Sequence, residues 1–174
     1  MVNSFRWRSW LGVSVVLFLL YGLANVLAAL VVPSTLVATG AGAPTGVVLS
    51  PDADAYLVGG SQVMAALRHD NPKLDTLLVS SMVGMCSQMM AFGILALGVT
   101  WFVIRRALAW GVWAVTAAAL IQAPYYAVIT SMYAGQGAPV GGGIGGLVPF
   151  YVLPLVAFAI GLVGLRHQRV PRLV

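Results

Sequence analysis

Apolar residues in this chain gather into four long runs, which cover about residues 10–32, 74–104, 107–130 and 147–165. Each run is close to or above the ~20 residues that a helix needs to cross ~30 Å of hydrocarbon. Apolar and polar residues do not alternate with a period of two, so strands of a membrane barrel are excluded. The pattern predicts an all-α fold, in which residues 1–174 form one integral membrane domain with a four-transmembrane-helix bundle.

The composition agrees with a membrane protein and excludes a soluble domain. Hydrophobic residues make up 60% of the chain and charged residues only 7%, whereas a soluble domain carries about 25% charged residues. The net charge of +5 must therefore be interpreted by the location of the charges. It does not predict a nucleic-acid partner.

The basic residues indicate how the predicted helices are oriented. Seven lie on one side of the membrane, three of them in a basic tail at 166–174: Arg6, Arg8, Arg105, Arg106, Arg166, Arg169 and Arg172. The other side holds only two basic residues and all the acids: Arg68, Lys73, Asp52, Asp54, Asp70 and Asp75. The positive-inside rule then predicts cytoplasmic termini in a multi-pass protein of the bacterial inner (plasma) membrane. The first run is longer than the ~7–15 residues of a signal-peptide core, so we expect it to remain as an anchor.

The two predicted outer loops differ in character. In the first, residues 33–73, "SPDAD" predicts a helix start with Ser50 as N-cap, Pro51 next, and Asp52 and Asp54 in the first turn. Apolar residues then recur at near-helical spacing: Tyr56, Val63, Met64 and Leu67. They predict a short amphipathic helix on the outer membrane face. The second loop, residues 131–146, is rich in glycine and predicts a flexible linker.

The segment "RHDNPKLD", residues 68–75, places acids and bases side by side. A structural interpretation accounts for them through helix ends. Asn71 would cap the second membrane helix, Pro72 would begin it, and Asp75 would lie in its first turn. Arg68 and His69 would end the preceding helix, where cations are favoured.

A functional interpretation of the same segment is a small exposed site. His69 would act as acid or base, with Asp70 or Asp75 as its orienting partner. His69 and His167 are predicted on opposite sides of the bilayer, so they cannot share a haem or another metal. Cys86 is the single cysteine, which excludes a disulfide within the chain or a thiolate metal cluster. We therefore predict no metal, no cofactor and no catalytic set.

No ionisable residue lies well inside any run, which argues against an autonomous ion-driven carrier. The runs do contain the neutral amides Asn25, Gln88 and Gln122, and we expect at least two of them to face the bundle interior. As contacts between helices, they would act with close-packing small residues: Ala24, Ala28, Ala157 and Gly161. Alternatively, they line an outward-facing pocket for a lipid or isoprenoid headgroup, walled by three tyrosines: Tyr125, Tyr126 and Tyr151.

One face of the second run carries four small or polar residues at helical spacing: Ser81, Gly84, Gln88 and Ala91. The same run belongs to a longer pattern, in which a helix, a short loop with arginines and a helix with tryptophans follow one another. This pattern covers "NPKLDTLLVSSMVGMCSQMMAFGILALGVTWFVIRRALAWGVWAV". It resembles small bacterial four-helix membrane proteins of the broad DoxX-like kind. The resemblance implies a four-helix bundle and assigns no catalytic residues.

Three functional hypotheses follow from the sequence. The first is a non-enzymatic accessory or scaffold subunit of a larger cell-envelope membrane complex, with other integral membrane proteins and membrane lipids as partners. The second is a lipid or isoprenoid binding or transport component that uses the amide-lined pocket. The third is an enzyme that acts on a lipid headgroup through His69 and the nearby aspartates.

Overall fold

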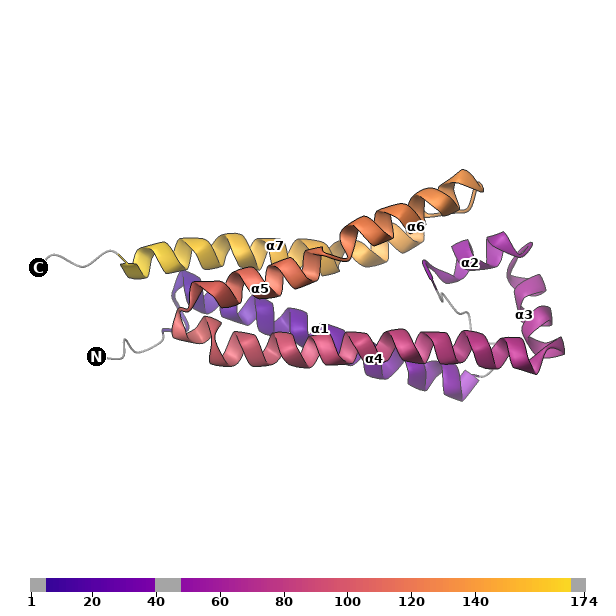
Figure 1. The fold of residues 1–174 in the computed structure, drawn as a ribbon, viewed down its shortest axis with the longest axis horizontal. Helices are drawn as coiled ribbons and strands as arrows, with labels where there is room; N and C mark the ends of the chain where they lie inside the picture. Colours follow the sequence, from indigo (N-terminus) through magenta and orange to yellow (C-terminus); the bar gives the residue numbers. More distant parts are fainter. Residues whose placement is uncertain (1–5, 40–47, 170–174) are drawn as a thin grey trace, which may run out of the picture. The chain divides into compact units, whose positions relative to one another are not determined.

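The computed structural model describes residues 6–39 and 48–169, and within these ranges the chain is helical without strands (Figure 1). The elements in chain order are α1 (Trp10–Thr39), α2 (Pro51–Leu57), α3 (Ser61–Asp70), α4 (Pro72–Phe102), the 3₁₀ turn η2 (Ile104–Arg106), α5 (Ala109–Leu120), α6 (Ala123–Gly135) and α7 (Gly141–Arg169). Four stretches are long and apolar enough to cross a membrane: Trp10–Leu36, Pro72–Arg106, Ala109–Gly135 and Gly141–His167. The prediction of an all-α fold with four stretches that are long and apolar enough to cross a membrane is confirmed for the described residues.

Two helix boundaries differ from the sequence prediction. The third apolar run is divided, because α5 ends at Leu120 and α6 begins at Ala123. Pro124 follows directly and has no N–H to continue the helical hydrogen bonds. The segment predicted as a flexible linker, residues 131–146, is mostly helical, since α6 reaches Gly135 and α7 begins at Gly141. Both helical parts belong to stretches that are apolar enough to cross a membrane, and in hydrocarbon a helix is the form in which a chain pairs its own peptide groups.

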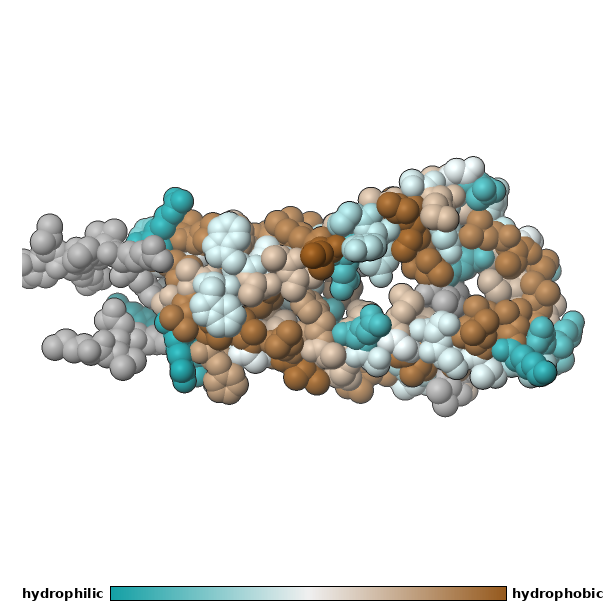
Figure 2. Space-filling model, viewed as in Figure 1, coloured by the Kyte–Doolittle hydropathy of each residue, from teal (hydrophilic) through white to brown (hydrophobic). Residues whose placement is uncertain are grey.

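The chain divides into two compact units. Unit 1 consists of residues 1–26, 91–122 and 149–174, and unit 2 of residues 27–90 and 123–148. The boundaries fall within α1, α4 and α7, so these three helices contribute to both units. Large apolar side chains are exposed on all the long helices, and brown apolar residues cover much of the surface in Figure 2. Exposed apolar surface of this kind suits hydrocarbon surroundings.

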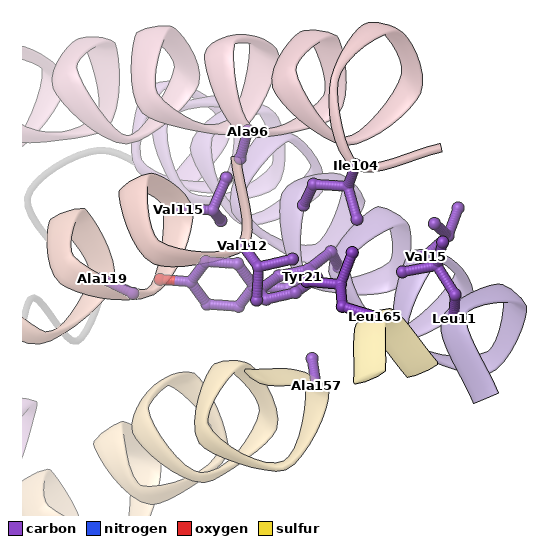
Figure 3. Close-up of a cluster of buried hydrophobic side chains, with 11 residues drawn as sticks. Leu11, Val15, Tyr21, Ala96, Ile104, Val112, Val115, Ala119, Ala157 and Leu165 are labelled. Carbon is purple, nitrogen blue, oxygen red and sulfur yellow. The ribbon is translucent and has the colours of Figure 1, made fainter. Parts of the chain in front are cut away.

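Unit 1 has a continuous apolar core to which α1, α4, α5 and α7 all contribute (Figure 3). Its buried residues on α1 recur at the spacing of three and four that marks one helix face: Leu11, Val15, Phe18 and Tyr21. The 3₁₀ turn and the other helices complete the core with these residues: Ala96, Ile104, Val112, Val115, Ala119, Ala157 and Leu165.

Glycines allow close helix crossings within unit 1. A Cβ on Gly93 of α4 would lie 2.9 Å from the carbonyl oxygen of Gly22 on α1 and 2.8 Å from Val26 Cγ2. On α7, a Cβ at Gly161 would lie 2.7 Å from Ser14 Oγ. Ser14 Oγ also donates a hydrogen bond of 2.6 Å to the Ala157 carbonyl, which joins α1 to α7. The small pair Ala157 and Gly161 therefore does mark a close contact, as predicted, and its counterpart is Ser14.

The crossing of α1 and α4 gives a stability prediction with a control in the same helix. Gly93→Ala should lower the free energy of unfolding by about 1–3 kcal/mol, because its Cβ meets backbone on α1. Gly84→Ala has nothing within 4 Å of its Cβ, so it should be neutral or stabilise α4 by up to about 1 kcal/mol. Chemical denaturation in mild detergent measures both changes. Equal destabilisation by the two variants would contradict the close crossing at Gly93.

Candidate functional site

Asp54 is a buried residue of unit 2 whose carboxylate accepts hydrogen bonds from several segments. Its helix begins as predicted, since Ser50 caps α2 by accepting a 3.3 Å hydrogen bond from the Ala53 N–H, and Pro51 follows. Asp54 is only 6% exposed, and its carboxylate accepts hydrogen bonds from the Val48 N–H at 2.9 Å and the Leu49 N–H at 3.3 Å.

A third donor connects this carboxylate to a distant part of the sequence. The Tyr133 hydroxyl donates a hydrogen bond of 2.8 Å to Asp54 Oδ1, and so ties α6 to α2. The sequence assigned Asp54 only a place in the first turn of a helix. No local pattern predicts its pairing with Tyr133, because the two residues are 79 positions apart.

Arg68 and Asp75 form a second buried polar contact, between the end of α3 and the first turn of α4. Arg68 is 2% exposed. Its Nη2 and Nε atoms both lie 2.6 Å from Asp75 Oδ1. A buried arginine of this kind requires a carboxylate, because leaving its charge without compensation in the interior costs several kcal/mol. Asp75 therefore pairs with an arginine of α3 and also places a negative charge in the first turn of α4, where the helix dipole favours it.

Within 68–75, Asn71 caps a helix, and His69 and Asp70 form an exposed pair. Asn71 Oδ1 accepts a 3.2 Å hydrogen bond from the Leu74 N–H, and α4 starts at Pro72, which confirms the predicted cap. His69 Nδ1 lies 3.2 Å from Asp70 Oδ1, with side chains that are 86% and 79% exposed. Of the two partners expected for His69, the structure provides Asp70, whereas Asp75 is engaged by Arg68.

The contact of His69 with Asp70 is exposed, and few neighbouring groups surround it that could orient a substrate or exclude solvent. Catalytic acid–base groups depend on a positioned substrate and on surroundings that tune their pKa. Within residues 6–39 and 48–169, no group of three or more His, Cys, Asp or Glu side chains could hold a metal ion. The contacts that the structure shows in 68–75 are a helix cap, an ion pair and the exposed contact of His69 with Asp70.

The expected pocket residues belong to both compact units, and their common pocket stays a prediction. Asn25 is buried, and its amide donates a 2.9 Å hydrogen bond to the Tyr21 carbonyl of its own helix. Gln88 and Gln122 are exposed, so the prediction that at least two of the three amides face the interior is wrong for this chain. Tyr125 is exposed, while Tyr126 and Tyr151 are partly buried. The six residues are shared between the units: Asn25, Gln122 and Tyr151 in unit 1, and Gln88, Tyr125 and Tyr126 in unit 2.

The orientation of α4 explains why Gln88 is exposed. The residues of α4 that turn inward, fully or partly buried, repeat at alternating spacings of four and three: Met82, Cys86, Met89, Gly93, Ala96 and Thr100. The opposite side carries the four small and polar residues singled out in the sequence, and all four are exposed: Ser81, Gly84, Gln88 and Ala91. We call these four residues the Gln88 face. Ser81 satisfies its hydroxyl on its own helix, at 2.8 Å from the Leu77 carbonyl.

Comparison with known proteins finds no match among protein-family models, curated proteins or solved structures. The resemblance to DoxX-like proteins stays a prediction from the sequence pattern.

The buried ion pair gives a prediction with a neighbouring control. Asp75→Asn should lower the free energy of unfolding by about 3 kcal/mol, because it removes the carboxylate that compensates the buried Arg68. Asp70→Asn makes the same chemical change at an exposed position and should stay within about 0.5 kcal/mol of wild type. Denaturation in mild detergent at neutral pH measures both. A stable Asp75→Asn variant would show that the ion pair does not hold α3 to α4.

Proposed function

We propose that this chain is a non-enzymatic accessory or scaffold subunit of a larger membrane complex, and that another integral membrane protein packs on its Gln88 face. The observation that carries the proposal is the exposure of Gln88 on a helix that is long and apolar enough to cross a membrane. An amide without a partner in hydrocarbon costs several kcal/mol. A neighbouring helix that hydrogen-bonds to Gln88 removes this cost.

The residues around Gln88 suit helix association. Nothing lies within 4 Å of a Cβ built on Gly84, so a second backbone has room to approach there. Ser81 and Ala91 extend the small surface by a turn on either side. Association of membrane helices depends on such small residues, and each interhelical hydrogen bond adds about 0.6–2 kcal/mol.

The polar residues outside the long helices also support a structural role. The Asp54 carboxylate accepts three hydrogen bonds within unit 2, and the one from Tyr133 joins α6 to α2. Arg68 and Asp75 join two helices. Of the three residues considered for chemistry at a lipid headgroup, Asp75 is engaged by Arg68, and the exposed pair His69 and Asp70 has no further orienting group among the described contacts.

The proposal places the protein in the bacterial plasma membrane with both termini in the cytoplasm. The distribution of arginine supports this orientation, since Arg6, Arg8, Arg105 and Arg106 lie at one set of helix ends. The short helices α2 and α3 then belong to the outer side. There the exposed Val63 and Leu67 of α3 are suited to the outer membrane face.

Substitution of Gly84 tests the proposal. Gly84→Leu fills the space over the Gln88 face without meeting this chain's own atoms within 4 Å of the Cβ. Recovery of a copurifying membrane protein from mild detergent should fall about tenfold, the effect of losing ~1.4 kcal/mol of contact. Val83→Leu is the matched control, because it adds volume at the same depth about 100° around the helix.

Quantitative mass spectrometry of the purified samples gives the readout, with the melting temperature as a check on folding. Wild type and Val83→Leu should retain the partner equally. If no membrane protein copurifies with wild type, or if Gly84→Leu retains it fully, the scaffold proposal fails. Loss of a bound lipid in Gly84→Leu, without any protein partner in wild type, would support the lipid-binding alternative instead.

A further inference from the structure

Unit 1 carries an excess of positive charge with no acidic side chain of its own. All Asp residues of the chain lie between positions 52 and 75, and the chain contains no Glu, so every acidic side chain belongs to unit 2. The arginines of unit 1 whose side chains are described lie at the ends of the apolar helices: Arg6, Arg8, Arg105, Arg106 and Arg166. The compact unit that carries these arginines therefore has a strong excess of positive side chains.

Exposed indole rings accompany these arginines. Trp7 and Trp101 lie with their ring centroids 6.3 Å apart. The guanidinium carbon of Arg105 lies 4.4 Å from the Trp101 ring centroid and 6.0 Å from that of Trp7. Trp10 and Trp110 at the starts of α1 and α5 are exposed as well. Tryptophan is favoured at the level of lipid headgroups, where its ring meets both apolar and polar surroundings.

The guanidinium of Arg105 lies over the Trp101 ring, within the distance of a cation–π contact. A guanidinium carries its N–H groups in a planar fork that fits a phosphate. Arg106 follows Arg105 in the 3₁₀ turn η2 and is exposed. The turn therefore carries two consecutive arginines, of which Arg105 contacts an exposed indole, at the end of a stretch that is apolar enough to cross a membrane.

We propose that this end of unit 1, centred on Arg105 and Arg106, binds the headgroups of anionic phospholipids. The positive charge of the arginines favours an anion. Their position beside indoles at the ends of apolar helices favours the headgroup of a lipid over a soluble anion. Hydrophilic residues (teal in Figure 2) border the apolar surface where α1 and α5 begin and α7 ends. The surface is distinct from the Gln88 face and does not depend on the scaffold proposal.

Lipid titration of the full chain tests this inference. Native mass spectrometry in mild detergent would give the apparent Kd for phosphatidylglycerol and for phosphatidylcholine. Wild type should bind phosphatidylglycerol more tightly, and Arg106→Gln should raise that Kd about fivefold, the effect of removing one basic residue near an anionic surface. Binding of phosphatidylcholine should not change.

Lys73→Gln is the matched control, because it removes one exposed positive charge from unit 2. It should leave both Kd values unchanged. Equal binding of the two lipids by wild type overturns the inference, and so does an Arg106→Gln variant that binds phosphatidylglycerol like wild type. An equal rise of the Kd for phosphatidylglycerol in Lys73→Gln would show an effect of overall charge only. Displacement of phosphatidylglycerol by inorganic phosphate would show a site for free anions, which also overturns the lipid assignment.

Discussion

Polar groups in apolar surroundings need hydrogen-bond partners, and this constraint shapes the whole protein. Among the described residues, no buried side-chain nitrogen or oxygen lacks a partner. Thr100 and Thr116 satisfy their hydroxyls on the carbonyls of their own helices, at 2.6 Å and 2.8 Å. Ser14 reaches instead across to α7. Gln88 differs from these residues because its amide is exposed on an apolar helix, and a partner in another chain would satisfy it.

The same constraint accounts for the charged residues of unit 2. Asp54 is buried with three donors around its carboxylate, and the buried Arg68 lies against Asp75. These contacts fix α2 and α3 to their neighbours, although each of the two helices is too short to be stable alone. Asp54, Arg68 and Asp75 thus connect segments of unit 2. Short helices connected in this way can present exposed residues at a defined position, which the proposed scaffold role requires.

Features that depend on residues close together in the sequence could be predicted from it. The four apolar stretches, the cap at Ser50 and the cap at Asn71 follow from length, composition and residues within one helical turn. Contacts between distant segments were not predictable, as the pairing of Asp54 with Tyr133 shows. The inward face of α4 was also missed for a physical reason. In an apolar helix the two faces differ little in hydropathy, so packing decides that Cys86 turns inward and Gln88 outward.

The central claim is that the Gln88 face contacts another membrane protein, and photo-crosslinking in native membranes tests it most directly. A photoreactive amino acid would replace Gln88 in one variant and Val83 in another, at positions about 140° apart around α4. We expect a discrete protein adduct from position 88 and lipid adducts alone from position 83. Lipid adducts alone from both positions would contradict the claim and leave Gln88 facing the bilayer.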